Sequence, residues 1–454
     1  MRRQGHRASP GGRRFRSLRV AALIAACAAL GRGAQPEEVL HRALERLHAS
    51  TRTFSKYACV ETVERRYFEP APGFAPAAGA APRSCSQVPA GGGGENAGRL
   101  EAVDRLRLDV TVSDGREIYS WPGATRFDTR DVGDIIREGP IGTGSFGTHL
   151  LAVFNNPRVR YEFAGEQTAA GRRLLEYRFH VPLDASQYRV RAGAFTRAIA
   201  YGGSFWLDAD SLDLRRLALH AENLPAETSI CGLGAELDYT AAPAGGAGFL
   251  LATQTELQIV FDSGRRTSNL TKFSACREYT AESEIVFEDE TPAAVNAAAS
   301  RAQRASVALP LGLPVKLAIE APIDTGTAAA GDPVSARVVQ AVRRPGSGEV
   351  LIPAGATVRG RLTRVEHHFL PEPYFLVAMS FNRLDWQDGS SRFAARAEEN
   401  EQLARQLGAS LSTENGGMRY WDVGVFLFPT SKSHYVVPAG FESKWITLAT
   451  RGRS

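Results

Sequence analysis

The chain has 454 residues, with 54 basic against 49 acidic side chains and a formal charge of +5, and this length favours two or three domains. Residues 1–34 contain eight arginines and no acidic residue, so the remaining chain has 46 basic and 49 acidic residues, a formal charge of −3. The basic balance thus belongs to the N-terminal segment alone, and we expect no nucleic-acid partner.

That N-terminal segment has the layout of a secretory signal, with arginines first, an apolar run at Val20–Ala26, and small residues up to Ala34. The run is far shorter than the roughly 20 residues of a membrane span, and we expect no transmembrane span after signal removal. Ile24-Ala25-Ala26-Cys27 resembles the lipobox of bacterial lipoproteins, in which the cysteine is lipidated, while ordinary cleavage after Gly31 or Ala34 is the alternative. The signal peptide is therefore 1–34, or 1–26 if Cys27 is lipidated.

One helix and then many strands follow. Residues 36–47 carry apolar side chains at helical spacing with acidic residues in the first turn, which predicts an amphipathic helix. Residues 70–98 are rich in proline, alanine and glycine and predict a disordered loop. Asp114-Gly115 predicts a hairpin turn. We expect strands at 57–68, 100–112, 117–121, 158–163, 173–181, 203–207, 212–220, 249–261 and 267–287, and short helices at 131–137 and 146–154.

Four cysteines besides Cys27 are widely spaced and even in number, which favours disulfides over a zinc site in an exported protein: Cys59, Cys85, Cys231 and Cys276. Their spacing leaves three pairings open. We lean to Cys59 with Cys276, because both lie early in strand patterns with similar flanks, and this leaves Cys85 to pair with Cys231.

An alanine-rich, polar stretch at 291–306 predicts a linker, and more short strands follow it. They are expected at 315–319, 333–342, 349–352, 357–365, 375–384 and 436–448, separated by glycine-containing turns, a pattern typical of a small barrel or sandwich. Between them, the polar residues 396–407 predict a solvent-exposed helical insertion.

Two groups of motifs resemble known families. Gly165–Arg173, then Gly203–Asp208 and Leu212–Leu217, form a Gly-Arg turn, a strand ending in Trp-x-Asp and a return through Leu-x-Arg. Residues 158–224 thereby resemble the half-barrel of periplasmic lipoprotein-carrier proteins and related envelope-stress sensors, and the helix at 36–47 fits the same plan. The loop at 70–98 departs from it.

In the C-terminal part, the motifs are Leu309–Val315, Gly331–Val334, Leu351–Gly360 and Phe381–Gly389. They resemble the β-barrel domain of outer-membrane channel proteins of conjugation and type IV secretion, which share an Ile-Pro-x-Gly-x turn and a strand closed by Asp-Gly. The long amphipathic segment that would line a membrane pore is missing, so the resemblance implies the barrel topology and not channel activity.

Together these features predict a mainly β (α+β) protein. An N-terminal curved antiparallel sheet, a half-barrel with a few short helices, occupies 35–290. The linker 291–306 leads to a small C-terminal β-barrel or sandwich at 307–454.

No pattern in the sequence predicts an active site. Asp208–Asp213 has oxygen ligands at a calcium-like spacing but lacks the turn glycine and closing glutamate of an EF-hand, so we interpret it as a polar β-turn. His367 and His368 would point to opposite faces of a strand and are expected at a solvent-exposed edge. The glycines of 142–147 are followed by no phosphate-binding lysine. We therefore predict neither catalytic nor metal-binding residues, no cofactor and no enzymatic activity.

The predicted function is that of an exported cell-envelope protein, in the periplasm or associated with the outer membrane, that binds a hydrophobic ligand, a lipoprotein or an extended partner. The candidate lining residues are the aromatic side chains on the predicted sheet, Tyr119, Trp121, Phe205 and Trp206, since aromatic rings supply large contact area. The alternative is a structural or assembly component that docks onto an envelope complex through the C-terminal barrel.

Overall fold

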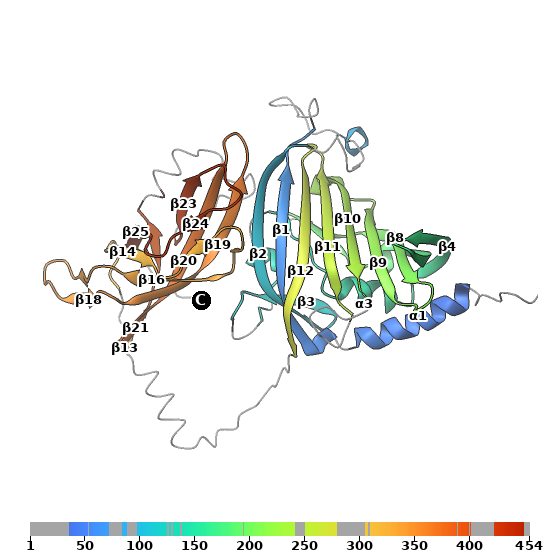
Figure 1. The fold of residues 1–454 in the computed structure, drawn as a ribbon, viewed down its shortest axis with the longest axis horizontal. Helices are drawn as coiled ribbons and strands as arrows, with labels where there is room; N and C mark the ends of the chain where they lie inside the picture. The colour runs from blue at the N-terminus through green and yellow to red at the C-terminus, as the bar shows by residue number, and fades with distance from the viewer. Residues whose placement is uncertain are drawn as a thin grey trace, which may run out of the picture.

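The computed structural model describes residues 36–448, except 53, 72–83, 89–97, 125–126, 129, 137–138, 194, 241–249, 279–304, 307–308, 388, 399 and 401–421. Cys27, most of the loop expected at 70–98 and most of the linker expected at 291–306 lie outside the described residues. The fold is mainly β with few helices, as the sequence predicts (Figure 1).

The N-terminal part is a long antiparallel sheet (Figure 1). Side chains alternate along its strands as expected: Leu106, Leu108 and Val110 are buried, whereas Arg107 between them is half-exposed. The hairpin turn predicted at Asp114-Gly115 is present, with positive φ angles of 50° and 72°. In spatial order the strands are β4 (Arg160–Ala169), β5 (Arg172–Val181), β8 (Ala200–Asp208), β9 (Leu214–Glu222), β10 (Ile230–Tyr239), β11 (Ala252–Phe261), β12 (Arg266–Glu278), β1 (Tyr57–Phe68), β2 (Leu100–Ser113) and β3 (Arg116–Ser120).

Helices and connecting segments cover the face of this sheet on which Leu106, Leu108 and Val110 lie, and we call it the inner face. Glu117 on β3 fixes part of the cover, because its carboxylate accepts hydrogen bonds from the backbone N–H groups of Gly144, Phe146, Gly147 and Thr148 and from the Tyr119 hydroxyl. The covering elements are α1 (Pro36–Thr51), α2 (Val132–Ile135), α3 (Thr148–Phe154) and the hairpin β6 (Arg189–Ala192) with β7 (Phe195–Ala198), with short 3₁₀ turns η1 (Phe54–Lys56), η2 (Cys85–Gln87), η3 (Leu183–Ala185) and η4 (Ala226–Thr228) elsewhere.

The C-terminal part is a smaller curled sheet. Its strands in spatial order are β22 (Ala395–Ala397), β25 (Glu442–Thr447), β14 (Pro314–Ile319), β16 (Pro333–Val338), β19 (Thr357–His368), β20 (Tyr374–Trp386) and β23 (Gly424–Pro429). No described strand pair closes the ring, although the Ala397 N–H donates to the Val423 carbonyl across the gap. Shorter strands complete this part: β13 (Ala305–Ser306), β15 (Ile323–Asp324), β17 (Val342–Arg343), β18 (Val350–Ile352), β21 (Gly389–Arg392) and β24 (Val436–Val437). The helix predicted to begin at residue 396 is wrong there, because Ala395 and Ala397 are buried strand residues.

The two parts meet along the outer edge of β2. The end of β19 pairs antiparallel with the start of β2, so that Glu366, His367 and His368 lie opposite Asp104, Val103 and Ala102. Further along β2, the backbone N–H of Arg107 donates to the Ala330 carbonyl, and the backbone N–H of Ala330 donates to the Arg105 carbonyl. We call these contacts of β2 with β19 and the 325–332 segment the β2 seam. Through it, a single sheet runs across both parts.

Charged side chains support the β2 seam. Arg105 donates to the carbonyls of Thr325, Gly326 and Ala328, and Arg107 forms an ion pair with Asp332. The expected solvent-exposed edge position of the two histidines is wrong: both are half-buried, because β19 is paired on one side with β20 and on the other with β2.

The main clusters of buried apolar side chains in the two parts are separate, and a third, small cluster of Leu376, Ala378 and Val425 lies on β20 and β23. Of the main clusters, one lies between the N-terminal sheet and its cover, and the other lies within the C-terminal sheet. On this basis we propose that the chain is divided into two domains, at 35–290 and 307–454.

Two disulfides cross-link the N-terminal part. Cys59 near the start of β1 is joined to Cys276 near the end of β12, and Cys85 in η2 is joined to Cys231 on β10. The first bridge joins two neighbouring strands near the start of one and the end of the other, and the second ties the segment before β2 to the sheet. These are the pairings to which the sequence inclined us.

Cleavage of the linker should leave the two parts associated, because the β2 seam holds them together. With a protease site introduced between residues 291 and 300, we expect both fragments to elute as one particle in size-exclusion chromatography. Arg105→Ala combined with Arg107→Ala should separate them. The control is Arg216→Ala, which removes exposed ion pairs with Glu236 and Asp238 on the same sheet. Co-elution of the double variant would contradict the role given to the two arginines.

The four cysteines of the N-terminal part should resist thiol reagents in protein that is unfolded without reductant. Reduction should lower the free energy of unfolding by about 2 to 4 kcal/mol for each bridge. Mass spectrometry after labelling, and denaturant unfolding with and without reductant, measure the two effects. Labelling at two or more of these positions would contradict the oxidised state.

Candidate functional site

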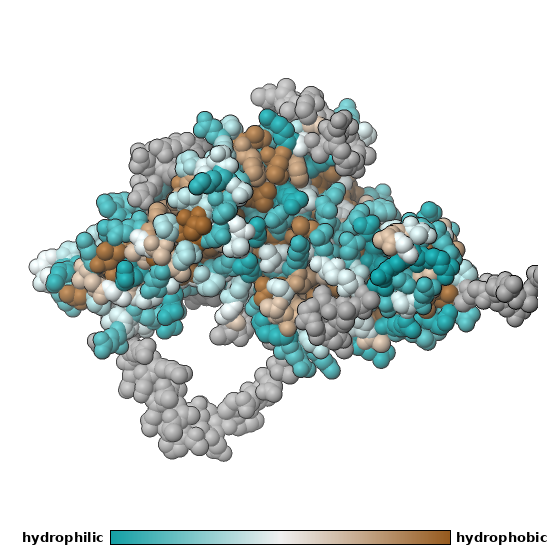
Figure 2. All heavy atoms as spheres, viewed as in Figure 1, coloured by the Kyte–Doolittle hydropathy of each residue, from teal (hydrophilic) through white to brown (hydrophobic). Residues whose placement is uncertain are grey.

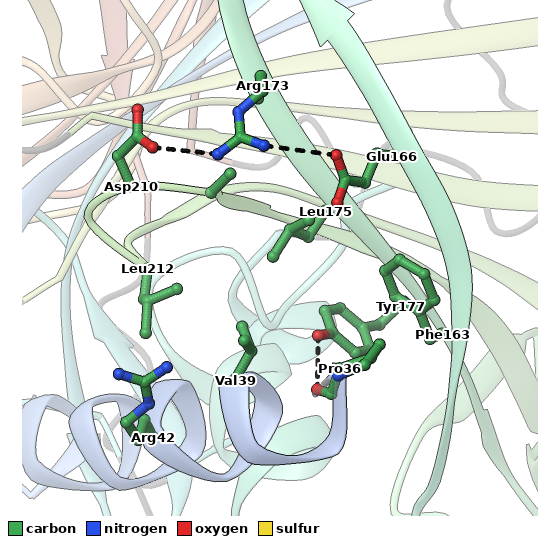
Figure 3. Close-up of a pocket in the computed structure, with 11 residues that line it drawn as sticks. Pro36, Val39, Arg42, Phe163, Glu166, Arg173, Leu175, Tyr177, Asp210 and Leu212 are labelled. Carbon is green, nitrogen blue, oxygen red and sulfur yellow. Dashed lines mark hydrogen bonds and ion pairs between the residues drawn. The ribbon is translucent and has the colours of Figure 1, made fainter. Parts of the chain in front are cut away.

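A pocket opens where the N-terminus of α1 meets the β4 end of the sheet. Its lining comes from α1, from the β4–β5 hairpin and from the turn between β8 and β9, as Figure 3 shows. The cavity volume is about 210 Å³. The lining residues are Pro36, Val39, Arg42, Phe163, Glu166, Arg173, Leu175, Tyr177, Ala209, Asp210 and Leu212.

The helix wall of the pocket follows from the amphipathic pattern of α1. Its buried residues Val39, Ala43, Leu47 and Thr51 recur every four positions, so one stripe faces the sheet. The Tyr177 hydroxyl donates a 2.8 Å hydrogen bond to the Pro36 carbonyl and so anchors the helix at its first residue (Figure 3). Burial, with a smaller contribution from Glu37, raises the pKa of Tyr177 to about 12, so this donor keeps its proton at neutral pH.

The turn between β8 and β9 is held by its own polar groups. The Asp208 carboxylate accepts hydrogen bonds from the backbone N–H groups of Asp210 and Ser211. Although burial raises the pKa of Asp208, these bonds and the Arg215 guanidinium lower it overall. Leu212 has a φ of +59°. The polar β-turn expected from the sequence is present, and it positions Leu212 in the pocket.

Charged residues rim the apolar lining. Arg173 lies 3.7 Å from a Glu166 carboxylate oxygen and 3.4 Å from one of Asp210, so it has acidic partners on both sides (Figure 3). Arg42 is exposed on α1, and its guanidinium points toward Leu212 in Figure 3. No described side chain forms an ion pair with Arg42. The pocket can therefore hold one apolar group and offers beside it the positive charge of Arg42, which forms no ion pair with the side chains that the structure describes.

The four aromatic residues expected to line a ligand site all lie outside this pocket. Tyr119 and Phe205 are fully buried in the N-terminal core, where Phe205 stacks on Tyr177 with ring centroids 5.3 Å apart. Trp206 is half-buried on the opposite face of β8. Trp121 is also half-buried, and the Arg361 guanidinium lies 5.1 Å from its ring centroid, next to the β2 seam. The sequence reasoning missed Phe163, Leu175 and Leu212.

A second group of polar side chains is buried on the inner face of β1, β11 and β12. Four oxygens there have no hydrogen-bond partner within the described part of the chain, namely Glu61 Oε2, Thr255 Oγ1, Thr267 Oγ1 and Asn269 Oδ1. Burial, and secondly the nearby Glu117, raise the pKa of Glu61 well above its ordinary value of 4.5. Burial of the Glu61 carboxyl group thus favours its neutral form and raises its pKa.

Among the residues that the structure describes, no group of three or more His, Cys, Asp or Glu side chains is placed to hold a metal ion. No helix in those ranges has the length and apolar character of a membrane span.

No protein-family model matches the chain, and no curated protein matches it. Solved structures similar to it include ComB10 of the Com type IV secretion system of Helicobacter pylori, at 12% identity, a TM-score of 0.18, and coverage of 31% of this chain and 86% of that one. A LolA superfamily protein from Nitrosomonas europaea is 10% identical with a TM-score of 0.25, covering 54% of this chain and 98% of that one. An outer membrane lipoprotein-sorting protein domain from Vibrio parahaemolyticus is 11% identical with a TM-score of 0.25, covering 54% and 95%.

Both kinds of protein that the sequence resembles are thus among the solved structures found.

Substituting Glu61 with glutamine should stabilise the protein at alkaline pH. As the pH rises above the ordinary pKa of 4.5, the unfolded chain ionises at Glu61 while the folded state does not, so folding stability is lost. Glutamine cannot ionise, and Tm of Glu61→Gln should therefore exceed that of the wild type at about pH 8 and match it at about pH 4. Thermal unfolding at both pH values tests this, with Glu256→Gln, on the opposite face of the sheet, as the control. A Tm difference that is independent of pH would contradict the neutral carboxyl.

Proposed function

We propose that this chain is an exported, non-enzymatic protein of the cell envelope that binds one apolar group of a ligand, lipoprotein or extended partner in the pocket between α1 and β4. The observation that carries the proposal is a contrast within the inner face of the N-terminal sheet. Much of this face is filled by the protein's own side chains, including Phe205, whereas its β4 end leaves an apolar, charge-rimmed pocket.

The volume of the pocket limits what it can take. Sites for drug-sized ligands enclose about 300 to 1,000 Å³, and the 210 Å³ found here is smaller. A lipid with several acyl chains therefore does not fit, whereas a single aliphatic chain or one large apolar side chain does. This favours a role in recognising part of a larger molecule over a role in enclosing a whole lipid.

Export is supported by the cysteines as well as by the N-terminal signal pattern. All four cysteines that the structure describes are paired. Disulfides persist in the periplasm and outside the cell, and they are rare in the cytosol. We place the protein in the periplasm or at the outer membrane on these grounds.

A second candidate function is favoured by the β2 seam. A C-terminal part joined to the sheet by backbone pairing is held in a defined position, as a component that docks onto an envelope complex would require. Under this alternative the C-terminal part contacts the complex and the N-terminal part acts as a spacer. Binding at the pocket distinguishes the two, because the spacer role needs none.

Decyl maltoside below its critical micelle concentration is a single-chain probe for the pocket. We expect saturable binding by isothermal titration calorimetry, and Phe163→Ser should weaken it by about tenfold, since an apolar wall worth about 1.5 kcal/mol is lost. The matched control is Phe195→Ser, which alters a phenylalanine of similar exposure outside the pocket. Absence of saturable binding, or equal loss in both variants, would leave the spacer function as the better explanation.

A further inference from the structure

The strand β4 leaves one backbone edge open. Within the described ranges it pairs only with β5, over its full length from Arg160 to Ala169. Nearly all of its side chains are exposed or half-exposed, and Figure 1 places it at the end of the sheet away from the C-terminal part. The surface over this end is mostly hydrophilic in Figure 2, with few apolar residues. An open edge presents a row of unpaired backbone donors and acceptors to which another chain can add.

The other end of the same sheet is treated differently. There, three residue pairs between β2 and β19 and the bridge from Leu106 to Ala330 cover the edge with this chain's own backbone. Pairing over a few residues, backed by charged side chains, thus suffices in this fold to seat one segment against a strand edge. No equivalent segment of the described chain covers β4.

The pocket lies directly beside the open edge. Phe163 and Glu166 belong to both, because they are β4 residues that line the pocket. Phe163 is 38% exposed, which leaves part of its ring available to a neighbour. A strand added to β4 would direct every second side chain toward this face of the sheet, where the pocket can take one of them.

The charged residues at the rim of the pocket favour a particular charge on the residue next to the inserted apolar side chain. Arg173 already has Glu166 and Asp210 as partners, whereas the exposed Arg42 has no acidic partner among the described residues. An acidic residue near the inserted apolar group would complement Arg42. A lipid with several acyl chains is disfavoured by the pocket volume, and a single acyl chain would leave the strand edge unused, whereas an extended polypeptide fits both the edge and the pocket.

We propose that an extended polypeptide segment of a partner protein adds to the open edge of β4 as a further strand, with one apolar side chain in the pocket and an acidic side chain facing Arg42. This rests on the proposed function and names the class of partner for the same pocket. Backbone hydrogen bonds supply affinity in this mode of recognition, and the pocket supplies the choice of sequence.

The irregularity of β4 limits how long the added strand can be. The register with β5 shifts between Phe163 and Gly165, and Gly165 has a φ of +142°, a conformation that favours glycine. A bulge of this kind interrupts pairing and protects an edge against indiscriminate addition. We therefore expect the partner to pair over a few residues on one side of the bulge, as β19 does on β2.

The experiment uses the whole exported chain and fluorescein-labelled synthetic peptides in which threonine and valine alternate, with a central leucine, valine or phenylalanine and a neighbouring aspartate. We expect saturable binding by fluorescence anisotropy for at least one peptide. N-methylation of alternate peptide amides should weaken it by about tenfold or more, since several backbone hydrogen bonds are lost. Phe163→Ser should weaken binding and Phe195→Ser should not. Arg42→Glu should weaken the aspartate peptide and strengthen its lysine counterpart.

The possible results separate this inference from the proposed function. Binding of decyl maltoside without binding of any peptide overturns the added strand and leaves the pocket function in place. Peptide binding that is insensitive to N-methylation also overturns it, because the backbone then plays no part. Failure of both probes overturns both proposals. Dimerisation in sedimentation velocity that Phe163→Ser abolishes would assign the edge to a second copy of this chain and overturn the partner proposed here.

Discussion

Backbone pairing along the outer edge of β2 is the interaction on which the arrangement of this protein depends. An antiparallel sheet that does not close has two edges, and each must be covered, paired or tolerated. Here β2 is covered by β19 and by Ala330, which makes one sheet of two parts that keep separate apolar cores. Burying the backbone edge requires that its charged neighbours find partners too, and Arg65 meets this need by pairing with Asp104 at 2.5 Å beneath the seam.

Side chains fill the inner face of the N-terminal sheet because the segments that cover it are held close to it. Glu117 holds the segment before α3 through four backbone N–H groups, and Phe146 from that segment packs between Phe54 and Phe273. A carboxylate shared among so many donors fixes the loop closely, because each lost bond would leave a buried donor unpaired. The large aromatic residues then fill the space beneath the helices and connecting segments, and a cavity lies at the β4 end.

Much of the fold could be predicted from the sequence because the spacing of apolar residues and the residue preferences of turns depend on neighbouring positions in the chain. The strand at Tyr57–Phe68 was predicted with the bounds it has, and α1 extends its prediction by one turn. Strand β10 was missed because Gly232 and Gly234 weaken the strand pattern, and they are tolerated where β9 and β11 pair on both sides. The half-buried His367 shows the same limit, since its burial depends on β2, far away in the chain.

The candidate site was beyond sequence reasoning for a related reason. Aromatic side chains were expected to line a ligand site because of their size, and size is also what fills a core: Phe205 and Tyr119 are fully buried between the sheet and the segments that cover it. A pocket forms where packing is incomplete, at the junction of a helix end, a hairpin and a turn that lie far apart in sequence. Leu212 illustrates this, because its place in the pocket is set by the Asp208 turn and not by any apolar pattern around it. The proposed binding surface therefore rests on incomplete packing beside a strand edge that pairs with no other described strand, and not on aromatic content.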